Sequence, residues 1–214
     1  MSKKIDGGFA IVKTLKELGI KDIFTLAGGH INPIYNACKD MGIRLIDFHH
    51  EQGASMAADA YGRVTKTPGV CLITAGPGLT NVVTGMSGAF LSNSPCMFLS
   101  GKSGVEELDR LPLQEIDQEN MVRPITKWAR AVYDTKRLSE YTAQAYKMCT
   151  SGRPGPVYLG FPHEVLYEEV DANQLDRPQI EMVSNPEMSD DDCEKFKELL
   201  TSSSRPVVLT GSGS

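Results

Sequence analysis

The chain lacks the sequence features that mark membrane-spanning, secreted and nucleic-acid-binding proteins. It has no apolar run of about 18 residues, the minimum for a membrane-spanning helix, and its first residues, MSKKIDGG, carry no apolar stretch of a signal peptide. Lysine and arginine are scattered along a chain of net charge −5, whereas binding to phosphates requires clustered positive charge. The sequence therefore predicts a cytoplasmic protein that has neither nucleic acid nor a membrane as a partner.

The cysteines form no CxxC pair, the spacing most often found in zinc sites and redox centres. Their number is odd and they are far apart: Cys38, Cys71, Cys96, Cys149 and Cys193. Three of them lie inside the apolar runs GVCLI, SPCMF and YKMCT. We therefore expect buried, reduced thiols in a reducing compartment and no metal site on this chain.

Short apolar runs alternate with helical patterns from residue 8 to about residue 162. The uninterrupted apolar run GVCLITA is typical of a buried parallel strand. Strands are expected at 22–27, 44–48, 69–75, 95–101, 128–134 and 156–162, and helices at 9–18, 31–42, 51–64, 79–92 and 136–150. This alternation predicts an α/β fold: a doubly wound parallel sheet with helices on both faces.

The composition changes after residue 167. Residues 168–188 are rich in Asp, Glu, Asn and Pro, as a surface linker is. A helix is expected at 190–200 and a strand at 205–214, which would begin a second α/β domain, but about 25 residues cannot bury a core of their own. We therefore expect a first domain at 1–167, a linker at 168–188 and the truncated start of a middle domain at 189–214.

Three turns that follow predicted strands carry candidate site residues, and ligands bind at that edge of an open parallel sheet. In the first, FHHEQGA, Glu51 stands at the start of a predicted helix. A carboxylate there is either a partner for the helix dipole or, in a poorly hydrated crevice, an acid–base group. His50 beside it is a candidate proton donor.

The other two turns are rich in glycine. In TAGPGLTN, Gly76 and Gly78 would let the backbone approach a flat ligand, and the helix that follows would attract an anion. In LAGGHINP, His30 either faces a ligand or is an ordinary loop residue. The TAGPGLTN turn matches neither a dinucleotide fingerprint nor a P-loop. The residues alone thus predict one candidate acid–base carboxylate beside two glycine turns, without naming a reaction.

Several motifs in a fixed order resemble the N-terminal pyrimidine-binding domain of the acetolactate synthase family of thiamine diphosphate enzymes. They are residues 24–95, LQEIDQENMVRPITKWA at 113–129 and SGRPGPVYLGFPHEVL at 151–166. The GGHINP turn is more similar to the branch that includes 2-hydroxyacyl-CoA lyases. The resemblance implies an enzyme that forms or cleaves carbon–carbon bonds of 2-keto acids, with acetolactate formation from two pyruvates as the leading hypothesis.

Two alternatives stay open beside that hypothesis. The first is a 2-hydroxyacyl-CoA lyase or another thiamine diphosphate decarboxylase or lyase, with an acyl-CoA as the substrate. The second, from another class, is a non-catalytic binding or regulatory module that keeps the fold.

The resemblance also implies roles for individual residues. Glu51 hydrogen-bonds the N1′ atom of the cofactor's aminopyrimidine, and Gln114 faces the reacting carbon. His30 lies on the substrate side, and His50 is a candidate proton relay. The other residues placed near the cofactor are Gly28, Gly29, Pro77, Gly78 and Asn81.

In the family that the chain resembles, Mg²⁺ and the diphosphate are bound by a Gly-Asp-Gly motif in a C-terminal domain, and this motif is absent from residues 1–214. The resemblance further implies a homodimer or homotetramer whose active sites lie between subunits. The resemblance also allows FAD as an additional cofactor, but no residue of this sequence identifies a flavin site.

We predict that the 214-residue chain by itself has no activity and binds the cofactor weakly, because the diphosphate has no metal and no acidic ligands to hold it. The measurement is consumption of pyruvate with thiamine diphosphate and Mg²⁺ added. Turnover by this chain alone would overturn the prediction.

Overall fold

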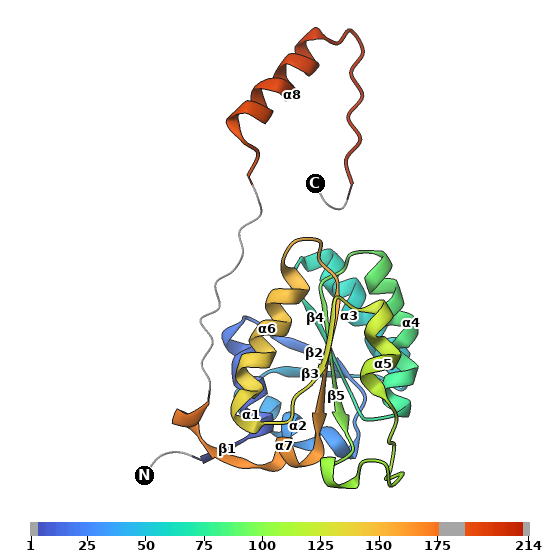
Figure 1. The fold of residues 1–214 in the computed structure, drawn as a ribbon, viewed down its shortest axis with the longest axis vertical. Helices are drawn as coiled ribbons and strands as arrows, with labels where there is room; N and C mark the ends of the chain where they lie inside the picture. Colours follow the sequence, from blue (N-terminus) through green and yellow to red (C-terminus); the bar gives the residue numbers. More distant parts are fainter. Residues whose placement is uncertain (1–3, 176–186, 212–214) are drawn as a thin grey trace.

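The computed structural model describes residues 4–175 and 187–211 and contains a six-stranded parallel sheet (Figure 1). Its strands are β2 (Asp22–Thr25), β3 (Arg44–Asp47), β4 (Gly69–Ile73), β5 (Cys96–Lys102), β6 (Trp128–Ala131) and β7 (Pro156–Pro162). Their order across the sheet is β3-β2-β4-β5-β7-β6. The chain therefore builds the sheet outward in both directions from neighbouring strands β2 and β4, and these two strands flank the switch point at which α/β proteins bind ligands.

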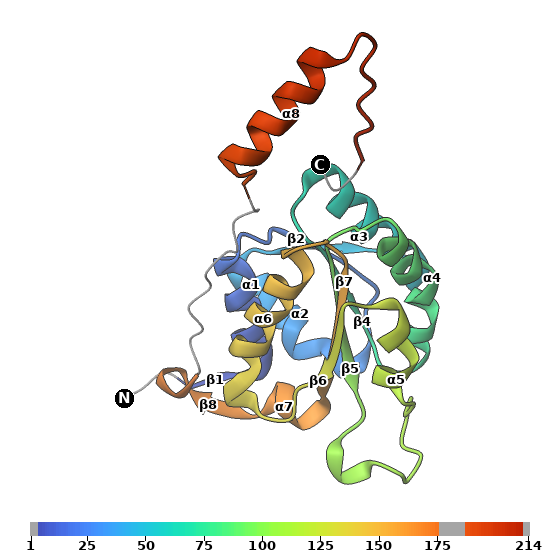
Figure 2. The same cartoon turned by 45° about the horizontal axis from the view of Figure 1, so that its top comes forward.

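Helices cover both faces of this sheet, as Figures 1 and 2 show. One layer contains α1 (Gly7–Glu17), α2 (Asn32–Met41) and α6 (Leu138–Thr150), and the other contains α3 (Glu51–Thr65), α4 (Pro77–Leu91) and α5 (Gln118–Val122). Successive residues of a strand point to opposite faces. Val70 and Leu72 of β4 accordingly join one hydrophobic cluster, whereas Cys71 and Ile73 join the other. The predicted doubly wound fold is confirmed.

Local sequence signals explain where several helices begin and end. The Asp6 carboxylate accepts a hydrogen bond from the backbone N–H of Phe9 at 2.7 Å and caps the start of α1. Gly42 ends α2 in the left-handed conformation, with φ +74°, which glycine adopts without strain. Pro77 occupies the first position of α4, where its missing N–H costs no helical hydrogen bond.

The remaining elements are short. They are the 3₁₀ helices η1 (Gly29–Ile31), η2 (Val105–Glu107), η3 (Arg123–Ile125), η4 (Thr135–Arg137) and η5 (Ala172–Gln174), the helix α7 (His163–Tyr167), and the strands β1 (Lys4–Asp6) and β8 (Glu169–Asp171). Strands β1 and β8 pair antiparallel, with Ile5 opposite Val170. Between β5 and β6 the chain forms η2, α5 and η3.

The structure corrects two expectations near the C-terminal end. Ordered structure continues past residue 167 into the predicted linker, because β8 pairs with β1 and Leu175 is buried; residues 176–186 of that linker lie outside the described part. The strand expected at 205–214 is wrong for 205–211, which form neither helix nor strand, and 212–214 are not described. A strand needs a partner strand for its backbone hydrogen bonds, and the described residues offer none there.

Helix α8 (Asp190–Ser202) confirms the helix expected at 190–200. The side chain of Ser189 caps its start, and three aspartates in its first turn suit the positive end of the helix dipole. No residue of α8 is buried, and it stands apart from the sheet in both views (Figures 1 and 2). None of the described helices combines the length and the apolar character that crossing a membrane requires.

The contact between α3 and α4 leads to a stability prediction. A Cβ atom at Gly85 would lie 2.1 Å from Ser55 Oγ, whereas a Cβ at Gly88, one turn further along α4, would meet only Asp59 Oδ2 at 3.6 Å. Gly85→Ala should lower the free energy of unfolding by about 1–3 kcal/mol through overpacking. Gly88→Ala, the matched control, should be neutral or stabilising because alanine favours helix. Urea unfolding measures both, and equal effects would contradict this packing.

Candidate active site

The three turns singled out in the sequence lie side by side in the structure. They follow β2, β3 and β4, which are neighbours in the order β3-β2-β4. Because these strands are parallel, their carboxyl ends meet at one edge of the sheet. His30, Glu51 and Thr74 therefore gather at the switch point.

Glu51 is the first residue of α3, and its side chain is held in place although it is polar and buried. The residue is only 8% exposed. Its Oε2 accepts a hydrogen bond from Asn81 Nδ2 at 2.8 Å, and Asn81 belongs to the adjacent helix α4. The positive end of the α3 dipole also stabilises a carboxylate at this position. The predicted neighbours Glu51 and Asn81 are thus brought together.

The backbone at Gly78 comes close to Thr74 and to this carboxylate. A Cβ atom there would lie 2.9 Å from Thr74 Cγ2 and 3.7 Å from Glu51 Oε1. Glycine thus lets the start of α4 lie directly against the Thr74 methyl group, with one carboxyl oxygen of Glu51 at van der Waals distance. The chemistry of a carboxyl group here suits a ring nitrogen of a flat heteroaromatic ligand, as the aminopyrimidine of thiamine diphosphate would require, and Pro77 is exposed nearby.

The turn after β2 approaches the same place. Gly28 is required by packing, because a Cβ there would come within 2.4 Å of Thr74 Cβ. Gly29 borders open space, so sterics do not explain its glycine. Nδ1 of His30 lies 3.2 Å from Thr74 Oγ1, within hydrogen-bond distance.

Thr74 is a site residue that the sequence reasoning missed. Its hydroxyl also donates to Gln114 Oε1 at 3.4 Å, so it joins His30 to the loop that follows β5. Gln114 itself adopts a left-handed conformation, with φ +66°, and its backbone lies against Gly76. A usable signal existed: Thr74 is the first polar residue after the apolar run of β4, at the edge where ligands bind.

His50 makes a structural contact at the start of α3. Its ring Nδ1 accepts a hydrogen bond from the backbone N–H of Gln52 at 3.1 Å, which caps the start of α3. The side chain is exposed. A proton relay through His50 stays a prediction.

A cavity of about 860 Å³ opens beside His30. Its other lining residues are Gly104, Val105, Glu106, Glu107, Tyr133, His163, Glu164 and Val165. Burial lowers the pKa of His30, and the nearby His163 lowers it further, while Glu107 acts in the opposite direction. The imidazole of His30 is therefore neutral near neutral pH, and it is the predicted site residue that lines this cavity.

Metal ligands are not assembled in this part of the protein. Within residues 4–175 and 187–211, no group of three or more His, Cys, Asp or Glu side chains is arranged to hold a metal ion.

A buried carboxyl group beside a glycine turn at the switch point of a parallel sheet is the arrangement of a ligand-binding α/β domain. The family model described as "Thiamine pyrophosphate enzyme, N-terminal TPP binding domain" matches residues 5–121. The chain belongs to this family of thiamine diphosphate (thiamine pyrophosphate) enzymes.

Two kinds of curated relatives are similar to the chain. The 2-hydroxyacyl-CoA lyase 2 of Danio rerio is 40% identical over 161 residues, which cover 75% of this chain and 26% of the relative. The acetolactate synthase large subunit of Lactococcus lactis is 34% identical over 100% of this chain and 37% of the relative. The acetolactate synthase large subunit IlvG of Mycobacterium tuberculosis is 33% identical over 98% of this chain and 38% of its own length. The chain thus spans between about a quarter and two fifths of these relatives.

The environment of His30 leads to a prediction about its titration. Because burial favours the neutral ring, we expect a pKa below the ordinary value of 6.5 in the folded chain. At a pH just below 6.5, this residue then binds more protons in the unfolded state than in the folded state. The free energy of unfolding therefore decreases as the pH falls through this range. NMR titration of the ring measures the pKa, and loss of the signal in His30→Gln assigns it. A midpoint at or above 6.5 would contradict the buried, unprotonated ring.

Proposed function

We propose that the protein containing this chain is a thiamine diphosphate-dependent enzyme that forms or cleaves a carbon–carbon bond of a 2-keto acid, in the manner of an acetolactate synthase. The observation that carries the proposal is the buried Glu51 carboxyl group, held by Asn81 and lying beside the backbone of Gly78. The similarity to acetolactate synthase large subunits over almost the whole chain supports this choice of reaction.

Glu51 is the acid–base group in this proposal. Thiamine diphosphate, when bound, supplies an electron sink for a carbon next to a carbonyl group. Glu51 shares a proton with a nitrogen of the aminopyrimidine ring, and Asn81 keeps the carboxyl group pointed toward it. The small exposed fraction of Glu51 keeps water from competing for that proton.

Other parts of the complete protein hold the diphosphate and Mg²⁺. Oxygen ligands such as Asp and Asn suit this ion, and it normally bridges to phosphate oxygens. The active site lies between two subunits of a homodimer or homotetramer. Support comes from Leu111 and Leu113, which are 88% and 76% exposed close to Gln114; large exposed apolar side chains beside a site suit coverage by another chain or domain.

A cytoplasmic location is part of the proposal. Four of the five cysteines are buried and free, and burial raises the pKa of Cys38 to about 12. Thiols of this kind are unreactive, and disulfides are rare in the reducing cytoplasm.

Cleavage of a 2-hydroxyacyl-CoA is the second candidate, and His30 is the observation that favours it. With the hydroxyl hydrogen of Thr74 directed to Gln114, the Thr74 oxygen accepts from Nδ1–H of His30, so Nε2 keeps its lone pair. A neutral imidazole in a cavity wall can accept a proton from a substrate hydroxyl group. Substrates with a 2-hydroxyl carry such a group, and pyruvate does not.

The proposal predicts that Glu51→Gln in the complete protein lowers kcat by about 10²–10⁴-fold, because an amide cannot exchange the proton. The free energy of unfolding should change little. Activity is measured with thiamine diphosphate and Mg²⁺, on pyruvate and on a 2-hydroxyacyl-CoA in parallel, which also separates the two candidate reactions. Glu140→Gln, at a surface ion pair with Arg137, is the matched control and should leave kcat unchanged. A Glu51→Gln enzyme within a few-fold of wild type would refute the role of Glu51.

A further inference from the structure

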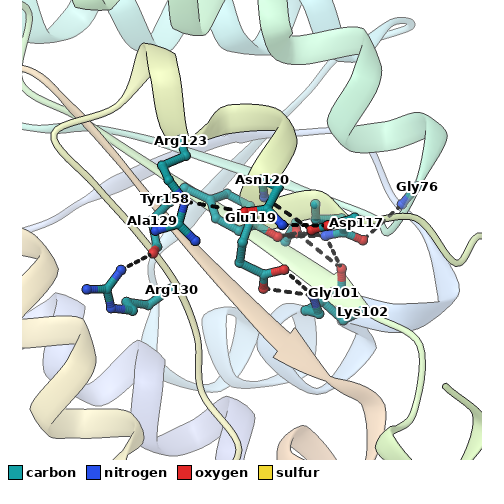
Figure 3. Close-up of polar contacts among 12 residues, drawn as sticks. Gly76, Gly101, Lys102, Asp117, Glu119, Asn120, Arg123, Ala129, Arg130 and Tyr158 are labelled. Atoms are coloured by element: carbon teal, nitrogen blue, oxygen red, sulfur yellow. Dashed lines mark hydrogen bonds and ion pairs between the residues drawn. The ribbon is translucent and has the colours of Figure 1, made fainter.

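Gln118, the first residue of α5, lies at the centre of a buried hydrogen-bond network beneath the glycine turn after β4. It is 1% exposed. Its Oε1 accepts a hydrogen bond from the backbone N–H of Gly76 at 3.2 Å. Its Nε2 lies 2.6 Å from the hydroxyl oxygen of Tyr158, 2.8 Å from Ser100 Oγ and 3.2 Å from the carbonyl oxygen of Gly101. Figure 3 shows Tyr158, Gly101 and Gly76 joined through these contacts.

The chemistry of these groups fixes which way the amide of Gln118 points. A backbone N–H can only donate, so the oxygen of the amide must face Gly76 and its NH₂ group must face β5 and β7. One arrangement then satisfies every partner. The NH₂ group donates to the hydroxyl oxygens of Tyr158 and Ser100, Tyr158 donates to Ser100 at 2.8 Å, and Ser100 donates to the Gly101 carbonyl at 3.1 Å.

A second contact fastens α5 to the sheet. Lys102 of β5 donates to both carboxylate oxygens of Glu119, at 2.7 and 2.6 Å, in a mostly buried ion pair (Figure 3). Gly160 makes room for it, because a Cβ there would lie 2.7 Å from Lys102 Cδ and from the Tyr158 hydroxyl oxygen. Gln118 is therefore anchored to two strands, β5 and β7.

The contact to Gly76 matters because of where that residue lies. Gly76 has φ +57° and ψ −109°, and it precedes Pro77 at the start of α4. The backbone of Gln114 lies against it, since a Cβ at Gly76 would come within 2.5 Å of the Gln114 carbonyl oxygen. The orientation of the Gly76 peptide thus determines both where α4 begins and the position of the Gln114 backbone.

We propose that Gln118 is a positioning residue of the active site: it holds the Gly76 peptide and so fixes the Gly76–Gly78 turn and Gln114 relative to each other. Gln118 does not touch the reacting atoms and acts through Gly76. The kinetic part of this inference rests on the proposed function, whereas the structural part does not.

The test uses the complete protein with thiamine diphosphate and Mg²⁺. Gln118→Met keeps a similar volume and removes both the acceptor and the donor. We expect faster hydrogen exchange at the Gly76 amide. We also expect a kcat lower by about tenfold to a hundredfold and a KM within about threefold of wild type, because misplacing catalytic groups lowers the rate more than it weakens substrate binding. Thr142→Val is the control, since it removes a buried hydroxyl that donates to Leu138 within α6. It should lower stability without changing kcat or exchange at Gly76.

Unchanged exchange at Gly76 together with unchanged kcat in Gln118→Met would overturn the proposal, and so would an equal loss of kcat in Thr142→Val. If Gln118→Met does not fold, Tyr158→Phe removes one anchor of the amide and should shift exchange at Gly76 in the same direction by a smaller amount; no shift there would count against the proposal. Faster exchange in Gln118→Met, combined with a wild-type protein that acts on neither pyruvate nor a 2-hydroxyacyl-CoA, would support the positioning contact and refute the proposed function.

Discussion

The hydrogen bond from Asn81 to Glu51 is the interaction on which the site depends. A carboxylate that is 8% exposed would be costly to bury without partners. Two features offset that cost here: the amide of Asn81 and the N-terminal end of α3. These features come from two helices packed against each other. The direction of the carboxyl group therefore depends on the packing of α3 against α4.

The α3–α4 contact and the turns around it depend on glycine residues, which have no side chain. At Gly85 the Cα surface of α4 lies directly against Ser55 of α3, and at Gly28 the backbone lies directly against Thr74. Close packing of this kind brings elements nearer than any Cβ would allow, and interiors at that density do not yield easily to added volume. The close packing that positions Glu51 thus makes the site sensitive to the addition of a single methyl group, as in a Gly→Ala substitution.

The polar groups near the site fall into two sets with different surroundings. His30 lines a cavity, and Glu51 and Thr74 lie beside the glycine turn at the same edge of the sheet, where a ligand can complete their hydrogen bonds. Gln118 and Tyr158 are enclosed and satisfy each other. Fully satisfied buried networks make a structure rigid, and here the rigid set lies beneath the set that is open to ligands. This arrangement suits a site that must hold its geometry while reactants enter and leave.

Much of this was determined by the sequence alone. Apolar runs such as that of β4 alternate with amphipathic helices, and a parallel sheet necessarily puts the turns of His30, Glu51 and Gly78 at one edge. Only the tertiary structure decided which side chains meet there. Gln118 and its partner Tyr158 are 40 residues apart, and Thr74 and Gln114 are equally distant. Local sequence patterns describe how one segment folds, and contacts over such separations arise only when strands from distant segments become neighbours.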